Sequence, residues 1–228
     1  MKNNNKMSTL SADSLATIDD TFTLGNIQLL STLNFPSLQS VDTVDWEGLP
    51  NLGSLSFTAG LSDVSSLSIQ NTVLGTLEGI NLMMVDTMFI VNNFYLNDIS
   101  MQISNVTQSM TLSANGDDVL AEFPNLKSGQ NIYLANCSTI NLQSLSAITG
   151  SLNLRSNYIT DLSLTNLTTV GKSFAVIDNA MLTNITAPSL KSVGGGFIIS
   201  NNTDLTSVTF AKLQTVGGAI DMNGAFKR

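Results

Sequence analysis

The chain holds 228 residues, of which 43% are apolar and only 11% are charged, so a sizeable core must lie beneath a surface wetted mainly by serine, threonine and asparagine. A net charge of −8 with nine scattered basic residues argues against binding to nucleic acid or anionic lipid, because both need clusters of lysine and arginine. A single cysteine, Cys137, excludes an intrachain disulfide.

The N-terminal stretch MKNNNKMSTLSADSLATIDD, residues 1–20, contains neither an apolar signal segment nor a clear repeat. We expect a disordered or irregular segment over 1–20, followed by one repeat domain over 21–228. The longest apolar run, near Met83 to Val91, is interrupted by Asp86 and is too short to cross a bilayer.

A pattern of apolar-x-apolar-x-x-Asn recurs at intervals of about 22 residues. Copies begin at residues 67 (LSIQNT), 88 (MFIVNN), 110 (MTLSAN), 132 (IYLANC), 152 (LNLRSN), 174 (FAVIDN), 197 (FIISNN) and 220 (IDM), and two weaker copies precede them around Phe22 and Val44. Such a steady step is typical of stacked structural repeats.

The apolar residues of each unit alternate over three to five positions, which is the period of a β-strand, and no unit has room for a helix. The pattern predicts an all-β fold: a right-handed, parallel β-helix-like solenoid of about ten coils, with two or three short strands in each coil.

The sixth position of the unit is a small, mostly polar residue. It reads Thr72, Asn93, Asn115, Cys137, Asn157, Asn179 and Asn202. Stacked one per coil, these side chains can hydrogen-bond to one another and to backbone groups left unpaired at a corner, so we predict a structural ladder. The glycines at 194–196 and 217–218 predict a second corner that requires positive φ.

Cys137 occupies a ladder position, and the chain contains no histidine that could activate a thiol. We therefore interpret Cys137 as a buried structural residue rather than a nucleophile.

A polysaccharide-active β-helix enzyme is the main alternative to a structural role, and it would need two acid/base groups on one face. The outward position of the repeated strand reads Ser68, Phe89, Thr111, Tyr133, Asn153, Ala175, Ile198 and Asp221, with a single carboxylate. We interpret two acidic groups, Asp117–Asp118–Glu122 and Asp42–Asp45–Glu47, as solvated turn residues. No catalytic residue, cofactor or metal site is predicted.

The same outward row contains Phe89, Tyr133 and Ile198 among small polar residues. An exposed strip of aromatic and amide groups could bind a sugar chain or a protein partner, although we prefer the interpretation that it is ordinary sheet surface.

Five N-x-S/T triplets occur, at Asn105, Asn136, Asn166, Asn184 and Asn201. The chain holds 25 asparagines and 52 serines and threonines, so chance accounts for this number and the triplets do not indicate secretion. Asn136 and Asn201 adjoin the ladder and are expected to point outward.

Several units, among them LPNLGSLSFTAG at 49–60, FPNLKSGQNIYLANCSTINLQSL at 123–145 and LKSVGGGFIISNNTDLTSV at 190–208, resemble the fungal GPI-anchored cell-wall organisation proteins, whose repeats are of the receptor L-domain class. The resemblance covers about residues 21–223 and implies a non-enzymatic surface glycoprotein of the fungal wall.

The resemblance also implies attachment to the plasma membrane or wall through a lipid anchor and contact with wall polysaccharide or wall proteins. Family members begin with a signal peptide and end with a Ser/Thr-rich stalk and an anchor signal, which this chain lacks, so we expect a truncation at the C-terminus. A receptor-like ligand-binding module remains a further alternative.

Overall fold

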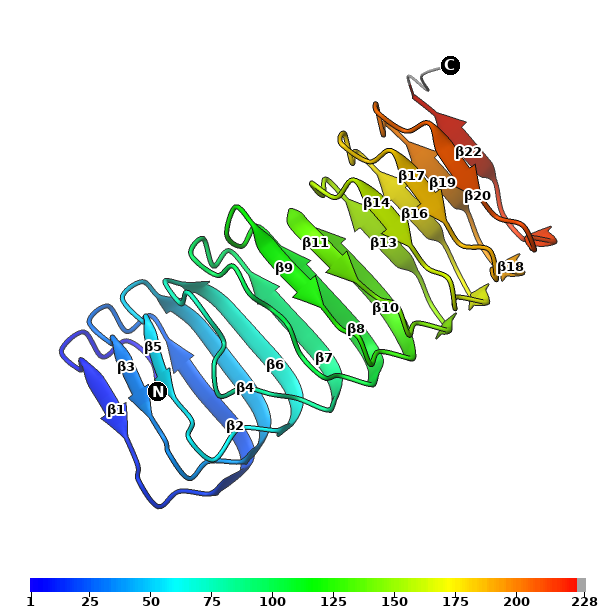
Figure 1. The fold of residues 1–228 in the computed structure, drawn as a ribbon. Coiled ribbons are helices and arrows are strands. Elements are labelled where there is room, and N and C mark those ends of the chain that lie inside the picture. The colour runs from blue at the N-terminus through cyan, green and yellow to red at the C-terminus, as the bar shows by residue number, and fades with distance from the viewer. Residues whose placement is uncertain (225–228) are drawn as a thin grey trace.

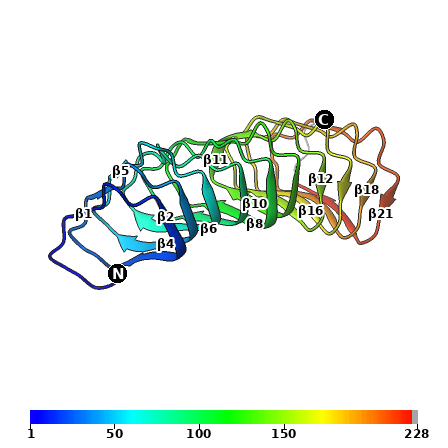
Figure 2. The same cartoon turned by 90° about the horizontal axis from the view of Figure 1, so that it is seen from below.

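A computed structural model describes residues 1–224, and among these residues every regular element is a β-strand. The strands stack into an elongated rod whose two ends are the first and last coils (Figure 1). Seen from a perpendicular direction, the coils follow one another in sequence order along the rod (Figure 2). The structure confirms the predicted all-β solenoid.

The main sheet contains a row of ten neighbouring strands, one from each coil. In the first six coils these strands are long: β2 (Thr17–Gly25), β4 (Ser40–Leu49), β6 (Asp63–Thr72), β7 (Met84–Val91), β8 (Asn105–Ser113) and β10 (Ser128–Ala135). In the last four coils the strand is divided in two: β12 (Ala147–Ile148) with β13 (Leu152–Arg155), β15 (Thr169–Val170) with β16 (Phe174–Ile177), β18 (Ser192–Val193) with β19 (Phe197–Ser200), and β21 (Thr215–Val216) with β22 (Ile220–Asn223).

Shorter strands form three small sheets on another side of the rod. The first contains β1 (Thr9–Ser11), β3 (Thr32–Asn34) and β5 (Ser54–Ser56), the second contains β9 (Val119–Glu122) and β11 (Cys137–Asn141), and the third contains β14 (Asp161–Ser163), β17 (Asn184–Thr186) and β20 (Ser207–Thr209). Between β5 and β9 the side wall has isolated bridges, such as Thr76 with Asp98, in place of strands, together with single backbone hydrogen bonds such as Asn97 N to Gly75 O.

Every strand pair is parallel, and equivalent residues of successive repeats lie directly beside one another. Phe174 pairs with Phe197, which pairs with Ile220, so the period found in the sequence is the period of the coils. Successive coils are about 4.8 Å apart, the spacing of neighbouring strands.

Residues 1–20 belong to the rod, which corrects the prediction of an irregular N-terminal segment. Strand β1 lies within them, and Leu10 pairs in register with Leu33. Strand β2 already begins at Thr17. The first coil is hard to recognise in the sequence because polar residues separate its few apolar positions.

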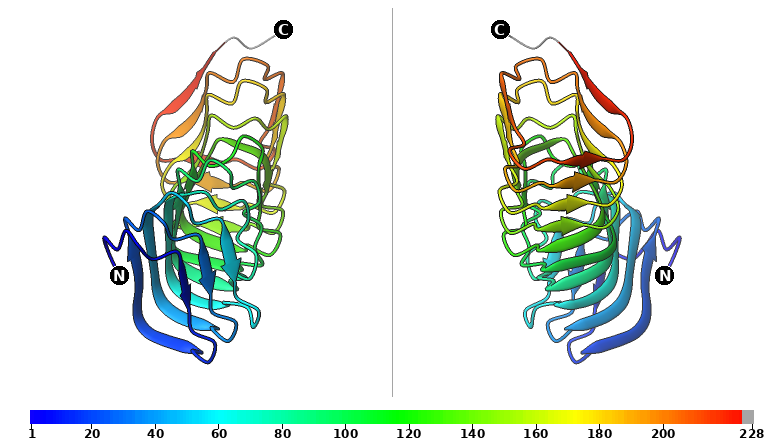
Figure 3. Two further views of the ribbon diagram at one scale, coloured as in Figure 1. Left: turned by 90° about the vertical axis from the view of Figure 1, so that its left-hand side faces the viewer. Right: turned by 90° about the vertical axis from the view of Figure 1, so that its right-hand side faces the viewer.

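The coils stack one behind another around a shared interior (Figure 3). A column of buried apolar side chains forms the core. One inward row consists of Leu67, Met88, Met110, Ile132, Leu152, Phe174 and Phe197, each at most 3% exposed. Rings stack within it: the centroids of Phe174 and Phe197 lie 5.4 Å apart and nearly parallel. Burial of this continuous column is the main force holding the coils together.

One corner carries a left-handed residue in almost every coil. These residues are Asn26, Asn71, Asn92, Ala114, Asn136, Ser156, Asp178 and Asn201, with φ between 50° and 61°, and Gly48 takes the same place with φ of 65°. The left-handed residue therefore lies one position before the ladder residue, and asparagine or aspartate fills it most often because these side chains tolerate this conformation.

The glycines at 194–196 and 217–218 form the second corner, but not for the predicted reason, since positive φ occurs instead at Gly48, Gly60, Gly79 and Gly224 among the described glycines. A Cβ on Gly194 would lie 2.1 Å from the Gly171 oxygen, and one on Gly217 would lie 2.3 Å from the Gly194 oxygen. Glycine is required because consecutive backbones approach too closely for a side chain.

Candidate functional site

The predicted ladder residues lie in one buried line. The Nδ2 of Asn93 donates to Oδ1 of Asn115 at 3.1 Å, and the same bond joins Asn157 to Asn179 at 3.0 Å and Asn179 to Asn202 at 3.1 Å. Each Asn Oδ1 also accepts a backbone N–H from the preceding coil, as in Asn157 N to Asn179 Oδ1 at 2.9 Å. The Thr72 hydroxyl begins the line by donating to Asn93 Oδ1.

The line is interrupted at Cys137. Its backbone N–H donates to Asn157 Oδ1 at 3.0 Å. Its thiol, however, donates to the Ala135 oxygen, 3.6 Å away, so no side-chain hydrogen bond links Cys137 to Asn115. Burial raises the pKa of the Cys137 thiol to about 12. A protonated, fully buried thiol is unreactive, which fits a structural role.

The predicted strip lies on the outer face of the main sheet, but Phe89, Tyr133 and Ile198 are each half-buried rather than exposed. Phe89, Thr111 and Tyr133 are adjacent in register on β7, β8 and β10. Ile198 stands apart, because Asn153 and the buried Ala175 separate it from Tyr133. The structure thus brings two members of the strip close together and leaves the third three coils away.

We call twelve outward residues in the later part of β6, β7, β8 and β10 the platform, which excludes Asp63 and Asp86 in the earlier part of β6 and β7. They are Ser66, Ser68, Gln70, Thr87, Phe89, Val91, Ser109, Thr111, Ser113, Asn131, Tyr133 and Ala135. None of them is charged. The long strands that carry them lie side by side over one flat face of the rod (Figure 1).

Charged residues bound the platform at both ends. Asp45 and Glu47 lie on the neighbouring strand β4, beside Ser68 and Gln70. Arg155 lies beside Ala135 and forms an ion pair with Asp178 at 3.0 Å. The uncharged surface is therefore limited to four coils.

None of the five N-x-S/T asparagines is one of the twelve platform residues. Asn166 and Asn201 are exposed, whereas Asn105, Asn136 and Asn184 are half-buried. The Asn136 Oδ1 accepts the Ala114 N–H at 3.3 Å, and the Asn201 Nδ2 donates to Asp178 at 3.0 Å. Two of them, Asn136 and Asn201, adjoin the ladder corner as expected.

The acidic groups considered in the sequence lie in different parts of the rod. Asp117 and Asp118 follow the ladder corner, Glu122 ends β9, and Asp45 and Glu47 are on the main sheet. Within residues 1–224, acidic residues and the cysteine form no group of three or more that could hold a metal ion.

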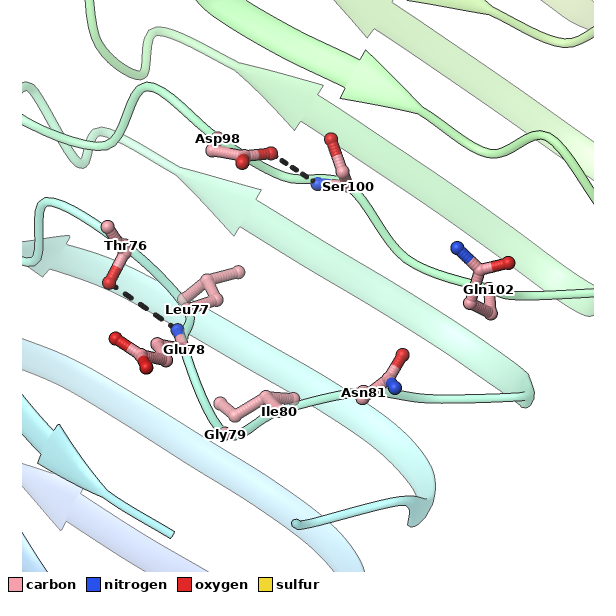
Figure 4. A pocket seen from close by; sticks show the side chains of 9 residues that line it. All are labelled: Thr76, Leu77, Glu78, Gly79, Ile80, Asn81, Asp98, Ser100 and Gln102. Carbon is pink, nitrogen blue, oxygen red and sulfur yellow. Dashed lines mark hydrogen bonds between the residues drawn. The ribbon is translucent and has the colours of Figure 1, made fainter. Parts of the chain in front are cut away.

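The structure also shows a side cleft that sequence reasoning missed (Figure 4). It has a volume of about 470 Å³ and lies in the interruption between β5 and β9, with Glu78 and Asn81 on one coil and Asp98, Ser100 and Gln102 on the next. Asp98 accepts the Ser100 N–H at 2.9 Å, so part of its polar lining stabilises local turns.

Comparison with known proteins gives several fungal relatives. Over 166 residues the chain is 38% identical to Protein ecm33 of Aspergillus fumigatus, covering 72% of this chain and 42% of the relative. It is 34% identical over 177 residues to Cell wall protein ecm33 of Schizosaccharomyces pombe, covering 78% and 42% of the two chains. It is 34% identical over 180 residues to a Cell surface GPI-anchored protein of Arthroderma benhamiae, covering 78% and 46%.

The chain belongs to the Ecm33 family of fungal cell-wall proteins. It spans less than half the length of these three relatives. No protein-family model and no solved structure matches the chain. No helix among the described residues of this Ecm33-family chain is long and apolar enough to span a membrane.

Proposed function

We propose that this Ecm33-family chain is a non-enzymatic structural module of the fungal cell wall that contributes to wall organisation and integrity. In its full-length form the protein is held at the cell surface by a GPI anchor, and its partners are wall polysaccharides or wall proteins. The observation that carries the proposal is the 34% identity, over 177 and 180 residues of these coils, to relatives named as a cell wall protein and a cell surface GPI-anchored protein.

In this proposal the module acts through the rigid, regular shape of its rod. A rod whose coils share one core and one hydrogen-bonded ladder holds its outer residues at fixed intervals of about 4.8 Å. A polymer that binds along such a rod meets a preorganised surface and loses less conformational freedom than on a flexible one.

The placement of the carboxylates favours a structural role over catalysis. Glycoside cleavage uses two carboxyl groups that flank one bond, with one of them held protonated by its environment. Asp117 and Asp118 occupy a loop at the ladder corner, and Glu122 belongs to the side wall. Asp45 and Glu47 are two residues apart on one strand and face solvent at the edge of the platform.

Two experiments test this function. The coils, placed within a full-length relative from which the corresponding coils were removed, should restore resistance to wall-perturbing dyes in a fungus lacking that relative. The purified chain should bind insoluble wall material yet release no sugar from pectin, β-glucan or chitin. Turnover abolished by Asp117→Ala, Asp118→Ala or Asp45→Ala would establish an enzyme instead.

Glycosylation of Asn105, Asn136, Asn166, Asn184 and Asn201 is part of the same proposal. Exposure favours Asn166 and Asn201. Secretion from a fungal host, followed by enzymatic deglycosylation and mass spectrometry, should find glycans at these two asparagines first, and unmodified peptides at both would contradict the assignment.

A further inference from the structure

The platform brings ring surface, hydroxyl groups and amide groups together without charge on one broad face. Phe89 and Tyr133 are two coils apart, or about 10 Å along the rod, with the Thr111 hydroxyl between them. Sugar rings stack on aromatic rings through their C–H faces, while their hydroxyls need donors and acceptors beside the stack. A sugar chain parallel to the rod axis would meet these groups in alternation.

We propose that the platform binds an uncharged polysaccharide chain lying along the rod axis, with sugar rings on Phe89 and Tyr133. This inference rests on the proposed function, because it names the site and the ligand class through which the module holds wall polymer. Thr111 contributes a hydroxyl between the two rings, and Asn153 extends the row beyond Tyr133.

Asn153 supplies an independent observation. Its Oδ1 is buried and has no hydrogen-bond partner. Buried polar atoms are nearly always paired, because an unpaired one costs about 1–3 kcal/mol in folding. Rotation of the Asn153 amide would present a donor and an acceptor to a hydroxyl of the sugar next to the one on Tyr133.

The charge distribution selects the class of ligand. A cationic or anionic polymer would gain from opposite charges along its path, but the twelve platform residues offer none, and Asp63 and Asp86 lie in the earlier part of β6 and β7, outside the row from Ser68 to Tyr133. Arg155, at one end, is already paired with Asp178. An uncharged polymer binds such a surface without an electrostatic desolvation penalty, because it leaves no buried charge without a partner.

The positions of the sequons agree with a face kept free for a ligand. None of the five asparagines is in the row from Ser68 to Asn153, and Asn166, Asn184 and Asn201 lie in later coils than the platform.

The experiment measures binding of soluble β-1,3-glucan and chitin oligosaccharides of increasing length by calorimetry. Affinity should rise with length until the oligosaccharide covers both rings, at about three sugar units. Phe89→Ala and Tyr133→Ala should each lower affinity by about tenfold with unchanged melting temperature. Phe94→Ala and Tyr158→Ala remove aromatic rings that are 68% and 52% exposed but lie outside the platform, so they should bind like the unmodified chain.

A charge placed between the rings distinguishes ligand classes. Thr111→Asp and Thr111→Lys should both weaken binding of the uncharged oligosaccharides, because either charge is desolvated by the ligand. If Thr111→Asp instead creates strong binding to chitosan oligosaccharides while the unmodified chain binds no uncharged probe, the uncharged class is wrong.

The outcomes separate the two proposals. If the unmodified chain binds wall polysaccharide and the four alanine variants bind equally well, the platform is not the site, although the proposed function stands. If the chain binds no wall polymer, the polysaccharide-binding part of the proposed function fails together with this inference. If Phe89→Ala and Tyr133→Ala convert a dimer into a monomer without changing oligosaccharide affinity, the platform is an interface between copies and the inference is overturned.

Discussion

The main strand turns the same corner in different ways in the first and the last coils of the rod. In the first coils the main strand passes through the corner as one piece of up to ten residues, as in β4 and β6, and the register shifts where an extra residue is accommodated. In the last coils glycine breaks the strand into two, as in β15 and β16. The inward residue before the corner is the same in both regions, since Val64 of an early coil and Val193 of a late coil are both buried.

The difference determines which side chains the corner can carry. A bulged corner leaves an outward position that Asp20, Asp42 and Asp86 fill, and each accepts a hydrogen bond from a threonine hydroxyl. The tight corner has room only for glycine where consecutive backbones meet. This contributes to a strong asymmetry: residues 1–122 hold 13 acidic and two basic residues, whereas residues 123–228 hold four acidic and seven basic residues.

We expect the largest loss of stability where a side chain is placed in the tight corner. Gly194→Ala places a Cβ 2.1 Å from the Gly171 oxygen and should lower the free energy of unfolding by about 3 kcal/mol. Gly196→Ala is the matched control, because the nearest atom lies 3.7 Å from its Cβ. Urea denaturation of both variants tests the comparison, and equal stability would show that the tight corner is not close-packed.

Both halves of the rod contain ladder residues, and removing one of these side chains should lower stability nearly as much as filling the tight corner. Asn179→Ala leaves the side chain and backbone N–H of Asn157 and the Leu154 oxygen without their partner, so we expect a loss of about 2–3 kcal/mol. Asn93→Ala tests the first half in the same way. Asn81→Ala, an exposed amide outside the ladder, should change thermal stability little.

The thiol at the break in the ladder should make stability depend on alkaline pH. Because the pKa of Cys137 is raised from 9.0 to about 12, the folded chain keeps a proton that the unfolded chain loses above pH 9. Stability should therefore be fully present below pH 9 and fall by about 1.4 kcal/mol per pH unit between 9 and 12. Cys137→Ala should lack this component in denaturation at several pH values, and an identical pH profile would contradict it.

Repairing the break should join the two ladder segments. Cys137→Asn supplies an amide that can accept from Asn115 and donate to Asn157, so we expect a gain of about 1 kcal/mol. Cys137→Ser offers a shorter polar side chain and should gain less. A loss of stability in Cys137→Asn, measured by chemical denaturation, would indicate that the slot is too small for an amide.

The smallest effect is expected at the ion pair. Arg155 and Asp178 are in contact at 3.0 Å, but the arginine side chain is 53% exposed. Asp178→Asn should lower stability by no more than about 0.5 kcal/mol, and moderate salt should remove the difference. A larger, salt-independent loss would instead point to the hydrogen bond that Asp178 accepts from the Asn201 side chain at 3.0 Å.

The sequence by itself determined the period, the strand type, the inward residues and the ladder positions. These follow from alternation and from one repeated polar slot, which are local properties of the chain. It also pointed to the family through whole units such as LKSVGGGFIISNNTDLTSV. It misplaced the start of the rod, because the first coil offers few apolar residues to set a period.

Only the tertiary structure decided what depends on neighbouring coils. It showed that Gly194 is required by the Gly171 oxygen rather than by its own φ, that the left-handed residue precedes the ladder residue, and that Ile198 is separated from the platform. The physical reason is the same in each case. Contacts between coils join residues about 22 positions apart, and their distances depend on how the backbones stack, which no local pattern records.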